Sequence, residues 1–337
     1  MEEFKNIASN GNSHNKQNRI LRAKWMDYRS PSIMMVTIVT TKRLPLLGKL
    51  QGENIILTEL GQKVAEEIKR IPTYNGAESI EIYSYVIMPD HVHILLHIHE
   101  HLPRHVGYYI RWFKKQCTNI GLALAVPSAR NHSPLFAPDY HDSLLKGKNQ
   151  LPHLVRYIQD NPRRLALKRA NKDLFRIRQN QQIGTIQCTV LGNIFLIEHP
   201  LRQVLQCSRR LTQEQIDNLK ADCLREAADG TVYVTAAISE GEKQIARALR
   251  EAGFPLIILL EKGFPAPDDP HYNYFKPQGV YFEACAAGKL LLIEPHRDLL
   301  DREDIATKTE AKVGHIPHDS QRYRFVAMNI LAEDICK

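Results

Sequence analysis

The sequence predicts two folded units of different class: an α+β unit in the first half and an α/β unit with a parallel sheet in the second. The chain has 337 residues, which is more than one hydrophobic core usually fills. Strand patterns dominate the first hundred residues, whereas strand and helix patterns alternate after residue 200. Such alternation is typical of a parallel sheet with helices on both faces.

The charge is unevenly divided between these halves. Residues 1–170 carry 24 Lys and Arg against 14 Asp and Glu, a net charge of +10, and residues 171–337 carry 21 against 23, a net charge of −2. A basic half joined to a nearly neutral half suggests that the first half binds a polyanion.

The amino-acid composition limits the class of protein further. Hydrophobic residues make up 43% and charged residues 24%, as in soluble globular proteins. No apolar run approaches the roughly 18 residues of a membrane span, and residues 1–30 do not resemble a signal peptide. The six cysteines form no CxxC pair, so we expect free thiols and a cytoplasmic location, with no membrane partner.

The first half divides into a basic lead-in, residues 1–30, and a folded domain, residues 31–165. Strands are expected at 34–41, 54–58, 79–88, 92–98 and 140–145, and helices at 59–70, 105–121 and 151–160. Thr58 is the expected N-cap of its helix. The third helix is expected to stop at Asn161, because Pro162 cannot continue it.

A polar, basic linker is expected at residues 166–184, followed by a second domain at 185–337. Its expected strands are 204–207, 231–236, 254–260 and 289–293, and its expected helices are 212–228, 241–252, 280–286 and 319–336.

Two pairs of residues are candidates for a catalytic site, although spacing alone favours Tyr157 as a helix tyrosine that packs on the sheet. His91 and His93 lie two apart on a strand, so their imidazoles point to one face while Val92 is buried on the other. Two such imidazoles can hold a divalent metal, although the histidines that continue the alternation to residue 101 make the pattern less specific. Tyr157 and Asn161 lie one helical turn apart, on one face of a helix.

These pairs suggest phosphoryl chemistry. An amide oxygen from Asn161 would complete a metal site with open positions for a phosphate, and the phenol of Tyr157 would attack that phosphate. Tyr140 is the rival nucleophile, but it lies on an expected strand and has no ligand-type residue four places further on.

Four motifs, in this order, resemble the single-tyrosine transposases of the HUH superfamily, in particular the REP-associated branch. They are VTIVTTKRLPLLG at 36–48, SYVIMPDHVHILLHI at 84–98, APDYHDSLLK at 137–146 and YIQDNP at 157–162. The resemblance implies a ferredoxin-like HUH nuclease domain and Mg²⁺ or Mn²⁺ held by His91, His93 and Asn161. It also implies single-stranded or hairpin DNA as substrate, and a 5′-phosphotyrosine at Tyr157.

Basic residues near this site are candidate DNA contacts, because lysine and arginine beside aromatic residues suit single strands. They are Arg111, Lys114, Lys115, Arg163 and Arg164. For the aromatic residues around Trp112 we expect core packing instead.

The second half resembles the Rossmann-like domain of the DNA-processing protein A and lysine-decarboxylase-like group. Its two strand-to-helix turns suggest an anion or nucleotide pocket formed by Ser208, Arg209, Ser239 and Gly241. Against this, Cys207 stands where that group has glycine, and Glu240 and Glu242 flank the second turn. A domain without a ligand, serving as a scaffold for a protein partner, is an equal alternative.

The sequence thus predicts an enzyme that nicks and rejoins single-stranded DNA, as in DNA transposition. The alternatives are a replication or mobilisation nickase with the same chemistry, and a DNA-binding protein that has lost catalysis. The pattern leaves open whether the chain forms a homodimer and whether Tyr157 acts in its own subunit.

Overall fold

The structure is a computed structural model, which describes residues 27–126, 134–145, 150–183, 186–260, 263–264, 281–295, 303–314, 316–318 and 320–337. Most of the basic lead-in and part of the loop predicted at 126–138 therefore lie outside the described residues. The chain divides into two compact units, Met1–Ala166 and Leu167–Lys337, each described here by itself. All six cysteines are free, as predicted.

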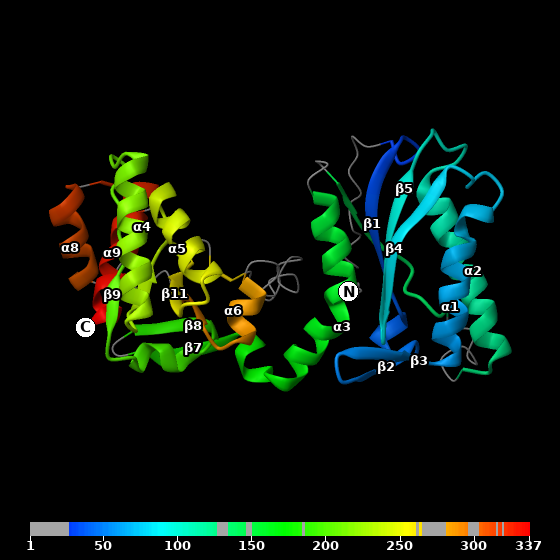
Figure 1. The fold of residues 1–337 in the computed structure, drawn as a ribbon, viewed down its shortest axis with the longest axis horizontal. Helices are drawn as coiled ribbons and strands as arrows, with labels where there is room; N and C mark the ends of the chain where they lie inside the picture. The colour runs from blue at the N-terminus through cyan, green and yellow to red at the C-terminus, as the bar shows by residue number, and fades with distance from the viewer. Residues whose placement is uncertain are drawn as a thin grey trace, which may run out of the picture. The chain divides into compact units, whose positions relative to one another are not determined.

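The first unit contains a four-stranded antiparallel sheet (Figure 1). Its order is β4 (Ile80–Met88), β5 (His91–Ile98), β1 (Ser32–Val39) and β6 (His141–Leu144). A small hairpin, β2 (Gly48–Gln51) and β3 (Asn54–Leu57), lies apart from this sheet. Apart from β2, these strands fall close to the ranges that the sequence predicts.

Helices cover both faces of this sheet. On one face, α1 (Glu59–Arg70) and α2 (Val106–Ala123) enclose the core with the alternate residues Val92, Ile94 and Leu96 of β5. Figure 1 shows α3 (Leu151–Ala170) on the opposite face. The odd-numbered residues of β5, which include His91 and His93, therefore face α3. Thr58 caps α1 as predicted, because its hydroxyl accepts a hydrogen bond from Gly61 N at 3.1 Å.

The prediction that the third helix stops at Asn161 is wrong. Helix α3 runs on through Pro162 to Ala170. Proline lacks the N–H that would bond Ile158 O, and this loss usually breaks a helix. Here Nδ2 of Asn161 donates to Tyr157 O at 2.7 Å and lies 3.5 Å from Ile158 O, so the side-chain amide supplies a donor where the backbone lacks one.

The second unit contains a six-stranded mixed sheet, whereas the sequence predicts a purely parallel one. Its order is β7 (Arg178–Ile183), β8 (Ile186–Gly192), β12 (Leu290–Pro295), β11 (Leu256–Leu259), β10 (Val232–Thr235) and β9 (Arg202–Val204). The last four pair in parallel, and β7 and β8 join them antiparallel.

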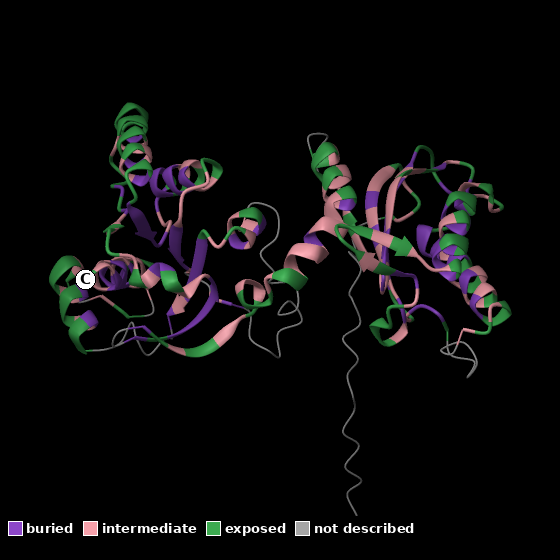
Figure 2. Ribbon diagram, turned by 60° about the horizontal axis from the view of Figure 1, so that its bottom comes forward, coloured by how far each residue is buried: buried purple, intermediate pink, exposed green. Residues whose placement is uncertain are grey.

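Two hydrophobic layers cover the faces of this sheet, as the alternating pattern predicts. One is formed by α4 (Gln213–Ala228), α5 (Glu240–Glu251) and α6 (Phe282–Ala286), and the other by α8 (Glu303–Val313) and α9 (Gln321–Cys336). Figure 2 shows the strands between them buried. Within the described part of the chain, no helix is both long and apolar enough to cross a membrane.

The segment expected to be a linker, residues 166–184, is largely structured. It contains the end of α3, the 3-10 helix η4 (Lys172–Phe175) and the whole of β7. Strand β7 has the sequence RQNQQI and lies at the edge of its sheet, where polar side chains remain in solvent. A polar edge strand lacks the hydrophobic alternation from which strands are predicted.

Candidate active site

The two histidines of β5 lie side by side on the face toward α3. The ring centroids of His91 and His93 are 4.8 Å apart, with the planes nearly perpendicular. Val92 is fully buried on the other face, as predicted. The strand therefore places two imidazoles next to each other, and a shared metal site requires such proximity.

Each imidazole is oriented through its Nδ1 atom. His91 Nδ1 lies 2.6 Å from Oδ1 of Asp90, and His93 Nδ1 lies 2.8 Å from the hydroxyl of Thr37 on β1. Among the described residues neither Nε2 atom has a hydrogen-bond partner. A metal-binding histidine usually has its second nitrogen held by such a neighbour, so both rings present Nε2 as the ligand atom.

Asp90 itself is fixed by the loop that follows β1. Its carboxylate pairs with Arg43 at 3.3 Å, and its carbonyl accepts hydrogen bonds from the amide and hydroxyl of Thr40, at 2.8 and 3.0 Å. Burial raises the pKa of Asp90, but His91 and Arg43 together leave it below its ordinary value. The residue is therefore a carboxylate at neutral pH and can orient His91.

The protonation state of His93 suits a ligand. Burial, reinforced by the positive charge that His91 can carry, lowers the pKa of His93 to about 3. The ring is therefore neutral at physiological pH, as metal coordination requires. The residues present thus fit a divalent metal at this point.

Tyr157 of α3 lies beside His93. Its ring centroid lies 5.9 Å from that of His93. The guanidinium carbon of Arg164, seven residues further along the same helix, lies 5.5 Å from the centroid of the Tyr157 ring. Burial raises the pKa of Tyr157 and Arg164 opposes that shift. The structure therefore brings together the tyrosine and one histidine that the sequence predicts.

Asn161 occupies the next turn of α3. With Nδ2 bonded to Tyr157 O, Oδ1 is the end of the amide left to bind a metal. Asn161 therefore has a local role in the helix, and its role as a metal ligand stays a prediction.

Tyr140, the rival nucleophile, is only 5% exposed and packs in the core between the sheet and α2. A Cβ atom on Gly107 of α2 would lie 2.9 Å from its hydroxyl, so the phenol points into that core. The structure thus favours Tyr157 over Tyr140.

The predicted DNA contacts on α2 lie away from the histidine pair, and their binding to DNA stays a prediction. Arg111 and Lys115 are exposed, but α2 covers the face of the sheet opposite the histidines. Lys114 donates to the carbonyl groups of Ala137, Pro138 and Asp139, so its ammonium anchors that segment. The sequence shows that a helix carries basic residues, but it does not show which face of the sheet that helix covers.

The aromatic residues of α2 follow the core prediction with one exception. Tyr109 and Phe113 are buried, whereas Trp112 is 44% exposed and lies against the ring of Tyr74.

The two adjacent arginines of α3, Arg163 and Arg164, make different contacts. Arg163 is paired with Asp160 through two contacts of 2.6 and 3.0 Å. Arg164 is 7% exposed and lies over Tyr157 instead of on the surface. Arg164 therefore lies beside Tyr157, and contact of either arginine with DNA stays a prediction.

The anion pocket predicted in the second unit is filled by the chain's own carboxylate. Glu242 is 3% exposed, and its oxygens accept hydrogen bonds from the backbone N–H groups of Cys207 (3.1 Å) and Ile238 (2.6 Å). Ser239 is a buried N-cap, and a Cβ atom on Gly241 would lie 2.3 Å from Cys207 Sγ. The glycine thus serves close helix packing.

The other two members of the predicted pocket are also engaged elsewhere. Ser208 accepts from Arg210 N, and the guanidinium of Arg209 lies 5.4 Å from the ring centroid of Phe325. The described parallel strands also follow one another in sequence order, with no reversal among them. The crevice that binds ligands in doubly wound sheets forms at such a reversal, which these four strands lack.

Sequence reasoning missed Asp90 and Thr37, and it named Arg164 as a DNA contact without placing it beside Tyr157. Asp90 directly precedes His91, so its adjacency was a usable signal. Thr37 pairs with His93 in the register of β1 with β5, and only that register reveals the contact. Arg164 lies beyond the proline at which the helix was expected to stop.

Comparison with known proteins is consistent with this site. Residues 54–161 match the family described as "Transposase IS200 like". The matched segment includes both histidines, Tyr157 and Asn161. The first unit therefore contains a segment similar to IS200-like transposases. The match covers less than half of the 337 residues and none of the second unit.

Individual relatives are distant. An uncharacterised protein of Haemophilus influenzae is 24% identical over 159 residues, which are 43% of this chain and 87% of that protein. Among solved structures, a REP-associated tyrosine transposase bound to a REP hairpin has a TM-score of 0.32, with 18% identity over 43% of this chain and 74% of its own. A proposed transposase from Deinococcus radiodurans has a TM-score of 0.27, with 19% identity over 42% and 97%. The transposase assignment rests on the family match.

Proposed function

We propose that the first unit nicks and rejoins single-stranded DNA through a covalent intermediate on Tyr157, as in DNA transposition. One observation carries the proposal: a tyrosine ring lies beside a pair of histidines whose Nε2 atoms are left for a metal. The match of residues 54–161 to IS200-like transposases supports this choice among phosphoryl-transfer reactions.

His91, His93 and Asn161 would hold the metal, through two imidazole nitrogens and an amide oxygen. Mg²⁺ or Mn²⁺ bound there would polarise the scissile phosphate. The chain's own part is to keep His93 neutral through burial and to orient both imidazoles through the contacts of Asp90 and Thr37.

The covalent step is a transesterification. The phenol of Tyr157 gives up its proton, its oxygen forms a bond to phosphorus, and the bond from phosphorus to the 3′ oxygen breaks. The 3′ oxygen takes a proton and leaves as a hydroxyl, while the 5′ phosphate stays on Tyr157. Attack by a 3′ hydroxyl reverses the step and rejoins the strand, so ATP is not required.

Arg164 is suited to the negative charge of the phosphate in this step. Its guanidinium lies over the attacking ring, on the same helix. We assign it to pairing with the phosphate attached to Tyr157, since arginine binds phosphate oxygens through two parallel hydrogen bonds. This contact would hold the intermediate in place until a 3′ hydroxyl attacks.

The site is completed within one chain, because His93 and Tyr157 of the same chain lie in contact range. We therefore propose that the tyrosine acts in its own subunit. Mixing a His91→Ala chain with a Tyr157→Phe chain should then restore no cleavage. Restored cleavage in the mixture would show a tyrosine acting in its partner's site.

A nicking assay separates the proposal from a DNA-binding protein without turnover. The full chain is incubated with a labelled single strand that carries a hairpin, in the presence of Mg²⁺. The proposal predicts two shorter products, whereas a binding protein would shift the strand and leave its length unchanged. Addition of a second strand with a 3′ hydroxyl should give a joined product.

A further inference from the structure

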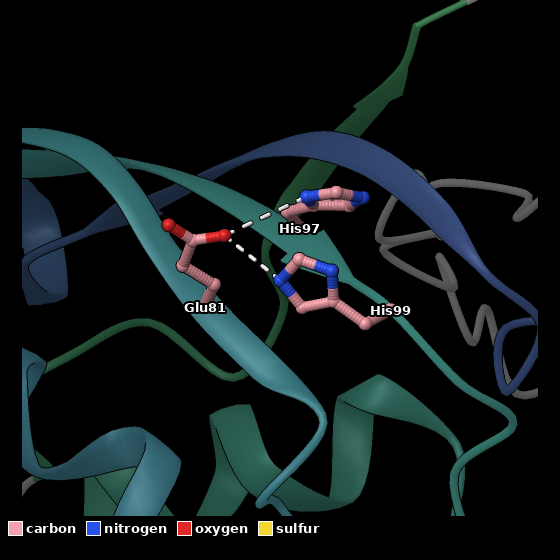
Figure 3. A group of neighbouring side chains, drawn as sticks. All are labelled: Glu81, His97 and His99. Carbon is pink, nitrogen blue, oxygen red and sulfur yellow. Dashed lines mark hydrogen bonds and ion pairs between the residues drawn. The ribbon is translucent and has the colours of Figure 1, made fainter.

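A second group of metal-ligating side chains lies on β4 and at the end of β5, outside the site described above. We propose that Glu81, His97 and His99 form a binding site for a divalent transition metal of the zinc class, separate from the His91 and His93 site. Figure 3 shows the two imidazoles side by side, with the carboxylate facing both.

The ligand atoms already converge. Oε2 of Glu81 lies 2.8 Å from Nε2 of His99 and 3.6 Å from Nδ1 of His97. All three ligand atoms lie within 4.8 Å of one another, and the two ring centroids are 3.9 Å apart. Small side-chain rotations would therefore place one ion in contact with all three.

Strand pairing fixes the positions of these residues. Glu81 on β4 lies directly opposite His97 on β5. His99 follows two residues later, and its backbone N–H donates to Ser79 O at 2.9 Å, which extends the pairing of the two strands. Residues at this spacing point to the same side, so the convergence of the three is set by the backbone.

The donor set indicates the class of ion. Two imidazole nitrogens and one carboxylate oxygen suit zinc and its neighbours, whereas Mg²⁺ and Ca²⁺ prefer oxygen ligands throughout. The side chains of Glu81, His97 and His99 are 51%, 30% and 48% exposed, so an ion can enter from solvent and keep water on its remaining positions.

This group is distinct from the proposed catalytic one. His97 follows His93 by four residues, or about 13 Å along a strand at ~3.3 Å per residue. An ion at Glu81 would therefore not reach a phosphate held at Tyr157. It would instead tie the edge strand β4 to the end of β5, which stabilises the folded unit by the free energy of binding.

Zinc titration of the full chain tests the site. Protein stripped of metal is titrated with Zn²⁺ in a calorimeter, for the native sequence and for Glu81→Gln and His99→Ala. His101→Ala is the matched control, because His101 is an exposed histidine two residues further on, and it contacts Asp27 at 3.3 Å instead of Glu81.

The proposal predicts that Glu81→Gln and His99→Ala each bind one zinc ion fewer than the native chain, while His101→Ala binds the same number. Thermal stabilisation by zinc should shrink in the first two variants and persist in the control. An unchanged number of ions and unchanged affinity in both variants would overturn the proposal.

The doubly substituted chain His91→Ala, His93→Ala shows that the two sites are separate. It should lose cleavage and still bind the ion that His99→Ala loses. If it binds no zinc at all, the ion belongs to the His91 and His93 pair and the second site is refuted. Because zinc is counted without reference to cleavage, failure of the proposed function would leave this result intact.

Discussion

The ring of Tyr157 lies 5.9 Å from the ring of His93, although 64 positions separate them in the sequence. Tyr157 lies on helix α3 and His93 on strand β5. The contact forms on the face of the sheet opposite α1 and α2. The same histidine is neutral and held by Thr37, and the same tyrosine lies beneath Arg164. These contacts give the predictions below.

Metal removal should stop cleavage. EDTA is expected to abolish nicking, and added Mg²⁺ or Mn²⁺ to restore it. His91→Ala should remove most activity because it deletes one of the proposed ligands, and His101→Ala is the control. His97 is unsuitable as a control because it contacts Glu81. Full nicking in excess EDTA would contradict the account.

Asp90→Asn tests the orientation of His91. Asparagine keeps the size of the side chain but removes the charge that faces His91 Nδ1. Changes in residues that hold a ligand usually cost about 10–100-fold in metal affinity or activity, and we expect a loss in that range. Manganese binding and the nicking rate measure it.

Arg43→Gln is the matched control for Asp90→Asn. It removes the ion pair of Arg43 with Asp90 and leaves the contact with His91 in place. Equal losses in both variants would show that Asp90 matters through the loop after β1 and not through the histidine.

Asn161 and Pro162 can be separated by a double substitution. Asn161→Ala should abolish cleavage, both as a lost ligand and as a lost donor at the break in α3. Adding Pro162→Ala restores the backbone N–H, which is worth up to about 3 kcal/mol in a helix interior. The double variant should therefore regain thermal stability without regaining cleavage. Recovered cleavage would show that Asn161 supports the helix and is not a metal ligand.

Several parts of this molecule could be predicted from its sequence because their signals are local. Thr58 marks the start of α1 as a capping residue, and alternation along β5 separates Val92 from the two histidines. Helix α3 was misjudged because Pro162 alone predicts a break, while the donor that compensates it belongs to the side chain of Asn161. Strand β7 was missed because an edge strand can be wholly polar.

The contacts that were hardest to predict depend on the register between paired strands or on how separate segments pack together. Thr37 reaches His93 only because β1 pairs with β5 in one register. Glu242 was noted as an unfavourable charge beside a predicted phosphate pocket. In the structure it occupies the backbone donors of that turn, and only the folded chain shows that one carboxylate joins the turns after β9 and β10.

Glu242→Ala should destabilise the second unit. It leaves the N–H groups of Cys207 and Ile238 without their partner, and an unsatisfied buried donor costs about 1–3 kcal/mol. Amide hydrogen exchange of peptides spanning residues 205–245 should accelerate. Glu240→Ala, at the exposed neighbour, should change stability by no more than about 0.5 kcal/mol. Equal exchange in the two variants would contradict the assigned role.

The most direct test of the central claim is the covalent bond itself. The full chain is reacted with a single strand labelled on the 3′ side of the cleaved bond, then denatured and separated by mass. The account predicts that label moves with the protein, that peptide mapping places it on Tyr157, and that Tyr157→Phe binds the strand without forming the adduct. Tyr140→Phe should form it normally. An adduct that persists in Tyr157→Phe, or label on any other residue, would contradict the account.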